Sequence, residues 1–396
     1  MKNSIILLCL ILAGFARATE LEPIFNRPGF DGKVIATVED KLIELTRQAL
    51  PGSSIRAALY EVDRVPMAEA LIEASKRGVN VELLFDGGNL ANKSVPGHAI
   101  SRLVNELQCA PGNDCLKFCK GPLSPLIKLT GIKKEYPLGN SCRGLIINHN
   151  KLFLFSELND GSKDVVAQTS ANMAENMMNM YNDLILVKND LAFFKGFNEY
   201  WDRLKKDHTV FFKDSFHNLE TADKKVKAYF FPRMTGSDPV LNLLKRVNCN
   251  LPGSSIRVLQ SVFTRKSVAQ QMKKLESEGC ALQVITRIDP VAFSPGKGVV
   301  QALGNSMIVL AFDGKLPEEK QPNSSHTKLV LINASIDNSP EKAAVVLTGS
   351  HNLDLFSLRT NDETLLEIRD QEIFDKYDAF ISQYLDDARA ANVRIF

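Results

Sequence analysis

Short apolar runs alternate with stretches of helical periodicity along this chain, and the same order occurs twice. In each copy an apolar run of strand length is followed by apolar positions at helical spacing and then by a second short apolar run. The two copies are residues 55–62, 67–77 and 81–85, and residues 256–263, 268–278 and 282–285. Gly78 and Gly279 follow the two helical stretches at the place where a helix takes a left-handed cap. Alternating strands and helices of this kind predict an α/β fold.

The two copies also share letters. Residues 51–56 read PGSSIR, and residues 252–257 repeat them without a change. From there the copies continue without a gap to the end of the second strand. This repeat is too long for a solenoid unit. We therefore predict two homologous α/β/α half-domains related by a pseudo-two-fold axis, with mixed sheets flanked by helices.

The hydrophobic pattern outside the repeated segments predicts where each half-domain begins and ends. We predict a first half-domain over residues 19–210 and a second over residues 211–396, joined by a charged and then aromatic segment at residues 205–239. The first half carries an insertion rich in Gly and Pro at about residues 87–143. Further helices are expected at residues 35–50, 191–204 and 371–388, and further strands at residues 145–148, 151–155, 165–169, 184–187, 328–332, 343–347 and 364–368.

The start of the chain resembles an export signal. Residues 1–18 combine a charged start, a short apolar run and a small-x-small site that ends at Ala18, so we predict a secreted protein, extracellular or periplasmic. Removing Lys2 and Arg17 with this segment from the 48 basic residues leaves 46, which balance the 46 acidic ones. A nuclease that binds duplexes usually carries a basic excess, so this balance disfavours nucleic acid as the substrate without excluding it.

Cysteine usage agrees with export. Six cysteines remain after the signal, four of them between residues 109 and 142 and the other two at Cys249 and Cys280. Their spacing does not match a zinc knuckle, and an exported protein meets an oxidising compartment. We expect two disulfides within residues 109–142 and one between Cys249 and Cys280, while the pairing among the first four stays open.

The chemistry is indicated by a motif that also occurs twice. His149 and Lys151 form one His-x-Lys unit, and His326 and Lys328 form the other; an apolar strand follows each. Side chains at i and i+2 of a strand point to the same face, so each unit presents one imidazole and one ammonium together. Two facing units would surround one small volume that suits a phosphodiester.

A Ser-x-Asn follows each unit, and an acid follows each Ser-x-Asn. The serines and asparagines are Ser170 and Asn172 in the first half and Ser350 and Asn352 in the second. The asparagine amides, with added serine hydroxyls, are expected to bind the phosphoryl oxygens. Asp183 and Glu363 each lie eleven residues after the asparagine, which predicts that both carboxylates orient a histidine.

These motifs resemble the phospholipase D superfamily, whose signature is His-x-Lys-x4-Asp followed by Gly-Ser-x-Asn in two copies. The second tail is especially similar, with Gly349 before Ser350, then Ser357, then residues 361–363 (Asn-Asp-Glu). The chain departs from the signature at Ser156 and Asn333, where the family has Asp, and at Thr169, where it has Gly. Some members, such as the tyrosyl-DNA phosphodiesterases, also lack that Asp. The overall form looks most like secreted bacterial phospholipase D-like proteins.

The resemblance implies a reaction through a phosphohistidine, with His149 as the nucleophile, His326 as the general acid and base, and each carboxylate serving the histidine of the other half. Lysines supply the positive charge, so no metal or other cofactor is expected. The interpretation we favour is a monomeric phosphoric diester hydrolase that cleaves a phospholipid headgroup and contacts a membrane surface. The alternatives are a secreted nuclease with the same chemistry and a non-catalytic phosphate-binding relative.

Overall fold

The computed structural model describes residues 19–28, 34–109, 112, 114–121, 139–206, 218–289, 292–311, 324–390 and 394–395. The predicted signal peptide at residues 1–18 and much of the second part of the insertion lie outside the described residues. Within the described part of the chain, no helix is long and apolar enough to cross a membrane.

The first half builds a seven-stranded sheet in the order β1-β7-β6-β5-β2-β3-β4. Its neighbours β2, β3 and β4 are parallel, and the remaining pairs are antiparallel, so the sheet is mixed. The strands are β1 (Glu20–Asn26), β2 (Ser54–Leu59), β3 (Asn80–Phe85), β4 (Leu116–Phe118), β5 (Lys151–Glu157), β6 (Lys163–Thr169) and β7 (Asn182–Lys188).

The second half builds a second mixed sheet in the order β17-β13-β12-β11-β14-β15-β16-β9-β8, with β10 paired to β14. Its parallel pairs are β11 with β12 and β12 with β13. The strands are β8 (Asn218–Glu220), β9 (Val226–Phe231), β10 (Val247–Asn248), β11 (Ser255–Gln260), β12 (Ala281–Arg287), β13 (Met307–Ala311), β14 (Lys328–Ile336), β15 (Lys342–Gly349), β16 (Glu363–Arg369) and β17 (Arg394–Ile395).

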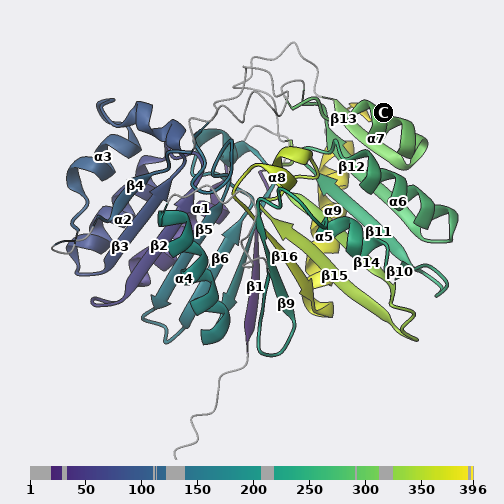
Figure 1. Cartoon of the computed structure of the whole chain (residues 1–396), viewed down its shortest axis with the longest axis horizontal. Helices are drawn as coiled ribbons and strands as arrows, with labels where there is room; N and C mark the ends of the chain where they lie inside the picture. The colour runs from purple at the N-terminus through teal and green to yellow at the C-terminus, as the bar shows by residue number, and fades with distance from the viewer. Residues whose placement is uncertain are drawn as a thin grey trace, which may run out of the picture.

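Helices cover both faces of each sheet, and the two sheets lie side by side in Figure 1 with β1 and β9 near the centre. One buried cluster joins residues of α4, α9 and both sheets, so the halves share a hydrophobic core. Separate clusters fill the opposite faces, under α1 and α2 in one half and under α5, α6 and α7 in the other. The helices are α1 (Thr37–Gln48), α2 (Val65–Lys76), α3 (Ala99–Glu106), α4 (Leu191–Lys206), α5 (Pro239–Leu244), α6 (Lys266–Ser277), α7 (Lys297–Leu303), α8 (Leu355–Arg359) and α9 (Gln371–Ala390).

The duplication predicted from the sequence is confirmed by the strand register. Leu59, the last residue of β2, pairs with Lys151, and Gln260, the last residue of β11, pairs with Lys328. Both His-x-Lys lysines therefore start equivalent strands at equivalent places. The two-half α/β architecture with mixed sheets is as expected.

Three expectations about local structure need correction. Residues 145–148 are not a strand: Asn148 makes only an isolated bridge, to Asp362 of the other half. The segment at 205–239 does more than cross between lobes, because β9 pairs with β16 at the edge of the second sheet. The insertion contains the 3-10 helix η1 (Gly87–Asn92), α3 and β4. These elements are short and interrupted by Gly and Pro, so hydrophobic periodicity did not predict them.

The part of the chain that the structure describes contains three disulfides, and they agree with the predicted framework. Cys109 pairs with Cys115, and Cys119 pairs with Cys142, both within the insertion. Cys249 pairs with Cys280 in the second half. The third bridge ties the entry of β11 to the end of α6, close to the repeated PGSSIR turn.

Candidate active site

The candidate site is built from corresponding strand ends of the two halves. Lys151 begins β5 and Lys328 begins β14, with each histidine two residues earlier. The Ser-x-Asn segments follow β6 and β15, and the next strands, β7 and β16, begin at Asn182 and Glu363. Backbone bonds between the halves bring these ends together: the His149 N–H donates to Asp362 O at 2.9 Å, and the His326 N–H donates to Tyr181 O at 2.9 Å.

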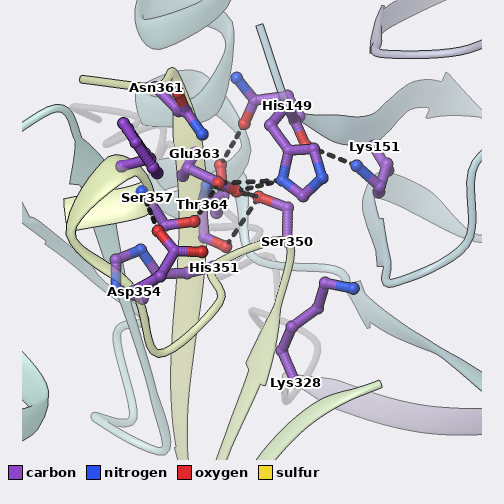
Figure 2. Close-up of polar contacts among 12 residues, drawn as sticks. His149, Lys151, Lys328, Ser350, His351, Asp354, Ser357, Asn361, Glu363 and Thr364 are labelled. Carbon is purple, nitrogen blue, oxygen red and sulfur yellow. Dashed lines mark hydrogen bonds and ion pairs between the residues drawn. The ribbon is translucent and has the colours of Figure 1, made fainter. Parts of the chain in front are cut away.

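His149 is held by a carboxylate from the other half. Its Nδ1 lies 2.9 Å from both Glu363 oxygens, and Glu363 has no exposed surface. Figure 2 shows the His149 ring directed at this carboxylate. Since an ionised carboxylate only accepts, Nδ1 carries the hydrogen and Nε2 keeps a free lone pair. Ser350 and Ser357 also donate to Glu363, the latter at 2.7 Å. This is the cross-half contact that the resemblance implied for Glu363.

His326 has a different partner. Its Nδ1 lies 3.0 Å from the backbone oxygen of Ser170, which belongs to the first half. A carbonyl oxygen also only accepts, so His326 again carries its hydrogen on Nδ1 and presents Nε2. The partner is neutral, however, and stabilises an imidazolium less than a carboxylate does.

The prediction that Asp183 orients His326 is wrong. The Asp183 carboxylate accepts hydrogen bonds from Thr348 and, at 3.0 Å, from the Tyr377 hydroxyl. Backbone pairing explains the error: Ser170 N–H donates to Asp183 O, whereas Ser350 N–H donates to Thr364 O. Asn182, not Asp183, is thus the structural counterpart of Glu363: the equivalent strand position comes ten residues after Asn172 but eleven after Asn352. A shift of one residue turns a strand side chain to the opposite face.

The hydroxyls of the two motif serines are buried and hydrogen-bonded within the protein. Both Ser170 and Ser350 have no exposed surface, and each hydroxyl donates inside its own half. Ser350 donates to Glu363, and Ser170 donates to Asn182 Oδ1 at 3.1 Å. Instead of the expected contact with phosphate, each serine hydroxyl holds a side chain of the next strand: Glu363 for Ser350 and Asn182 for Ser170.

The two lysines are fully buried, and burial lowers the pKa of both. The Lys151 pKa falls to about 8, because burial outweighs the nearby carboxylates of Glu363, Glu61 and Asp86. The Lys328 pKa falls well below its usual range, because burial is reinforced by the charge of Lys151 and of Arg287. Each ammonium donates to the backbone oxygen of its own motif histidine, at 2.8 Å for Lys151. Two buried cations in one site favour an anionic ligand.

Burial also shifts the pKa values of the two histidines and of Glu363. Burial and the two ammonium groups hold the His149 pKa well below its usual range, which keeps the imidazole neutral and nucleophilic. Burial and Lys328 do the same for the His326 pKa. Burial raises the Glu363 pKa to about 7, against the opposing effect of Lys151.

The two asparagines flank this centre. Asn172 is 4% exposed and donates from Nδ2 to Glu61 at 2.8 Å. The Oδ1 atoms of Asn172 and Asn352 are buried and have no hydrogen-bond partner among the described residues. Each amide thus retains an acceptor oxygen without a partner in the described part of the chain.

Several neighbours of the motif were missed in the sequence. The Tyr60 ring lies against the His149 ring at 5.1 Å between centroids, and Lys151 Nζ lies 5.1 Å from the centre of the same ring. Burial raises the pKa of Asp86 to about 7, and Asp86 occupies the position that Arg287 holds in the second half. An alignment of the two halves would have shown this reversal of charge, because Asp86 follows the last pair of β2 with β3 and Arg287 follows the last pair of β11 with β12.

His351 is a structural residue in this fold. It is 1% exposed and stacks on Phe231 with ring centroids 4.0 Å apart. Its Nε2 lies 3.4 Å from Arg265, which forms a buried ion pair with Asp238. Among the described residues, no group of three or more His, Cys, Asp and Glu side chains is arranged to hold a metal ion.

Comparison with known proteins agrees with this geometry. The family model described as "Cardiolipin synthase, PLD-like domain" matches residues 42–205 and 248–385, more than half of the chain. No curated protein matches the chain.

Two solved structures share the fold. The chain is similar to phosphatidylserine synthase from Haemophilus influenzae, with a TM-score of 0.55 and 11% identity over 94% of this chain and 87% of that one. It is also similar to polyphosphate kinase from Porphyromonas gingivalis, with a TM-score of 0.52 and 13% identity over 92% of this chain. The match spans only 50% of that kinase.

The site and the comparisons lead to one assignment. The family match includes both His-x-Lys units and both Ser-x-Asn segments, and the structure brings the two sets to one centre. The chain therefore belongs to the PLD-like domain family of the phospholipase D superfamily, whose members act on phosphodiesters as phosphodiesterases or phosphotransferases.

Proposed function

We propose that this chain is a secreted phosphodiesterase that hydrolyses the headgroup ester of a phospholipid through a phosphohistidine intermediate. The observation that carries the proposal is the pairing of His149 with a buried carboxylate at 2.9 Å, opposite a second histidine whose partner is neutral. This difference supports separate roles for two imidazoles that look alike in the sequence.

In the first step, His149 Nε2 attacks the phosphorus atom. The bond to the leaving alcohol breaks as a P–N bond forms, and the alcohol oxygen takes a proton from His326 Nε2. Glu363 stabilises the positive charge that develops on the His149 ring, as the carboxylate of a catalytic triad does. Lys151, Lys328 and the asparagine amides compensate the charge on the non-bridging oxygens.

In the second step, His326 acts as the base. It removes a proton from water, the water oxygen attacks phosphorus, and the P–N bond to His149 breaks. His326 must be protonated before the first step, although its own surroundings disfavour the cation. The negative charge of a bound phosphodiester supplies the compensation that the ligand-free site lacks.

A lipid substrate is favoured by the balance of charge. The 46 basic residues left after residues 1–18 are removed equal the 46 acidic ones, and a duplex-binding nuclease usually has a basic excess. The apolar side chains Phe293 and Leu355 are 71% and 61% exposed, and Leu355 lies three residues after Asn352 of the second Ser-x-Asn segment. Exposed apolar side chains of this size suit contact with a lipid surface.

The test uses the mature chain, residues 19–396, without added metal. It is incubated with vesicles of phosphatidylcholine and phosphatidylethanolamine and, separately, with single-stranded DNA. Release of the headgroup alcohol with phosphatidic acid as the second product is the expected result. Cleavage of DNA without lipid hydrolysis would replace the lipid proposal by a nuclease, and binding without turnover of either would replace it by a phosphate-binding relative.

A further inference from the structure

Tyr60 places an aromatic ring at the catalytic centre of the first half, where the second half has a small residue. The last residue of β2 pairs with Lys151, and the last residue of β11 pairs with Lys328. The next residue along the chain is Tyr60 after β2 and Ser261 after β11. The ring is therefore present only on the side that supplies the proposed nucleophile.

The Tyr60 ring packs against the imidazole of His149. Their centroids are 5.1 Å apart, and their planes are inclined at 63°. Glu363 holds Nδ1 of the same imidazole at 2.9 Å, but a hydrogen bond at one atom still allows the imidazole to tilt. A packed aromatic neighbour opposes this motion, because a tilted imidazole would overlap the Tyr60 ring or lose contact with it. Tyr60 and Glu363 together restrict the direction in which Nε2 points.

The same ring lies beside the ammonium group of Lys151. Lys151 Nζ is 5.1 Å from the centre of the Tyr60 ring, within the range of a cation–π interaction. Lys151 has no exposed surface, and its Nζ donates to the backbone oxygen of His149 at 2.8 Å (Figure 2). A buried ammonium group is costly, and the face of an aromatic ring reduces this cost.

Charged groups act on Lys151 from longer distances. Burial lowers the Lys151 pKa to about 8, against three carboxylates that raise it: Glu363 of β16, Glu61 after β2 and Asp86 after β3. In the described part of the chain, Lys151 forms no ion pair with any of them. Beyond burial, the charge of Lys151 contributes to the lowered pKa values of His149, His326 and Lys328. The Tyr60 ring thus supports an ammonium group that lacks a direct ionic partner.

The hydroxyl of Tyr60 does not account for these contacts. Burial raises the pKa of this hydroxyl, and the surrounding carboxylates raise it further, so the phenol stays neutral. The hydroxyl has no hydrogen-bond partner among the described residues. Asn89 donates to the backbone oxygen of Tyr60 and so holds the chain at this point. The side chain acts on the site through its ring.

We propose that Tyr60 is a positioning residue of the nucleophilic half, whose ring aligns His149 for attack and keeps Lys151 in its ammonium form. The inference rests on the two-histidine chemistry of the proposed function and adds a residue that the repeated motif does not contain. It applies to any diester substrate, because both contacts are made to groups of the reaction centre.

The test measures kcat and kcat/KM for bis(p-nitrophenyl) phosphate as a function of pH. Tyr60→Phe keeps the ring and should stay within about twofold of the wild type at each pH. Tyr60→Leu removes the ring and should lower kcat roughly tenfold. Its alkaline limb should also move to lower pH by roughly one unit, because loss of the ring lowers the Lys151 pKa. An unchanged limb in Tyr60→Leu, or an equal loss in Tyr60→Phe, would overturn the proposal.

Tyr229→Leu is the matched control. Tyr229 is also half-buried, and Lys227 Nζ lies 5.7 Å from its ring centre, but this pair belongs to β9 and the Tyr229 hydroxyl donates to Glu367. The variant should keep the alkaline limb at the pH of the wild type, even if it is less stable. An equal displacement in Tyr229→Leu and Tyr60→Leu would show that loss of any such ring shifts the profile, and the role of Tyr60 would be rejected.

A graded series covers the case in which Tyr60→Leu does not fold. Phenylalanine analogues with an increasing number of ring fluorines, introduced at position 60, keep the shape of the ring but weaken its attraction for a cation. The alkaline limb should move stepwise to lower pH along the series. A limb that stays in place would contradict the contact with Lys151.

A titration without turnover separates this inference from the proposed function. The Lys151 side chain is followed by NMR of lysine labelled with ¹³C at Cε, and its signal is identified by its absence in Lys151→Arg. The midpoint should be lower in Tyr60→Leu than in the wild type and unchanged in Tyr60→Phe. If no diester is hydrolysed but the midpoint shifts in this way, the proposed function fails and the contact stands. An unshifted midpoint in Tyr60→Leu would refute the contact whatever the substrate.

Discussion

The two histidines of the site have the same sequence motif and different surroundings. His149 rests on the Glu363 carboxylate of the other half, whereas His326 rests on the Ser170 carbonyl. The charges at equivalent positions of the two halves also differ. The first half has Glu61 and Asp86 where the second has Val262 and Arg287. Duplication has thus produced two similar frames, and later substitutions have made one centre with a negative and a positive side.

This difference separates the two catalytic roles. A nucleophilic imidazole becomes cationic when it is phosphorylated, so an adjacent carboxylate stabilises the intermediate. A general acid must give up its proton, and a neutral partner together with Lys328 and Arg287 makes this easier. If the surroundings determine the roles, substitutions in the two halves should have unequal effects.

The largest effect is expected from the histidines themselves. His149→Ala removes the nucleophile and should lower kcat by ~10³-fold or more for any diester. His326→Ala should slow hydrolysis of an alkyl diester by a similar factor but affect a p-nitrophenyl diester much less, because that leaving group needs little protonation. Steady-state rates on both substrates check this. An equal leaving-group dependence in the two variants would mean that the roles are not separated.

Substitutions of the two acids, Glu363 and Asp183, should also differ in their effect on kcat. Glu363→Gln removes the charge that supports His149 and should lower kcat roughly 10²-fold. Asp183→Asn, which contacts Thr348 and Tyr377 rather than a histidine, should lower kcat far less, although it can reduce the melting temperature. Rates and thermal unfolding of both variants decide the matter, and a larger kinetic loss in Asp183→Asn would restore the symmetric arrangement.

The error over Asp183 shows what the sequence could and could not provide. The repeat, the two motif units and the α/β class follow from local patterns and from letters that recur. The partner of each histidine depends on strand register across the halves, where one extra residue before Glu363 changes which side chain faces the centre. Equal spacing in the sequence concealed this difference, and only the backbone pairing of Ser170 and Ser350 reveals it.

A smaller loss is expected from Asp362, which attaches the insertion to the site. Its buried carboxylate accepts the backbone N–H groups of Cys142 at 2.6 Å and Gly144 at 2.8 Å, and its own backbone bonds His149. Asp362→Ala should lower kcat about tenfold by loosening the approach of His149 to Glu363.

A pair of disulfide variants provides the control. Replacing Cys119 and Cys142 by Ser should reproduce part of the Asp362→Ala loss, since Cys142 donates to Asp362. Replacing Cys109 and Cys115, in the same insertion, should leave kcat close to that of the wild type. Equal losses in both pairs would assign the effect to general stability.

The smallest effects concern pH. Because burial raises the Glu363 pKa to about 7, kcat/KM should halve near this pH as the medium is acidified and the carboxylate loses its charge. Because the Lys151 pKa is lowered to about 8, kcat/KM should fall again as the pH rises through that value and the ammonium is neutralised. A soluble diester gives the profile, and in Glu363→Gln the acid limb should disappear. An acid limb that persists unchanged would assign it to another group.

The inequality of the two halves is tested most directly by locating the covalent intermediate. The wild-type chain is mixed with a p-nitrophenyl diester, quenched within a single turnover under alkaline conditions that preserve phosphohistidine, and digested for peptide mapping by mass spectrometry. We predict that the adduct lies on His149, next to the Glu363 carboxylate. An adduct on His326 would contradict the account, because the nucleophile would then be the histidine without a charged partner.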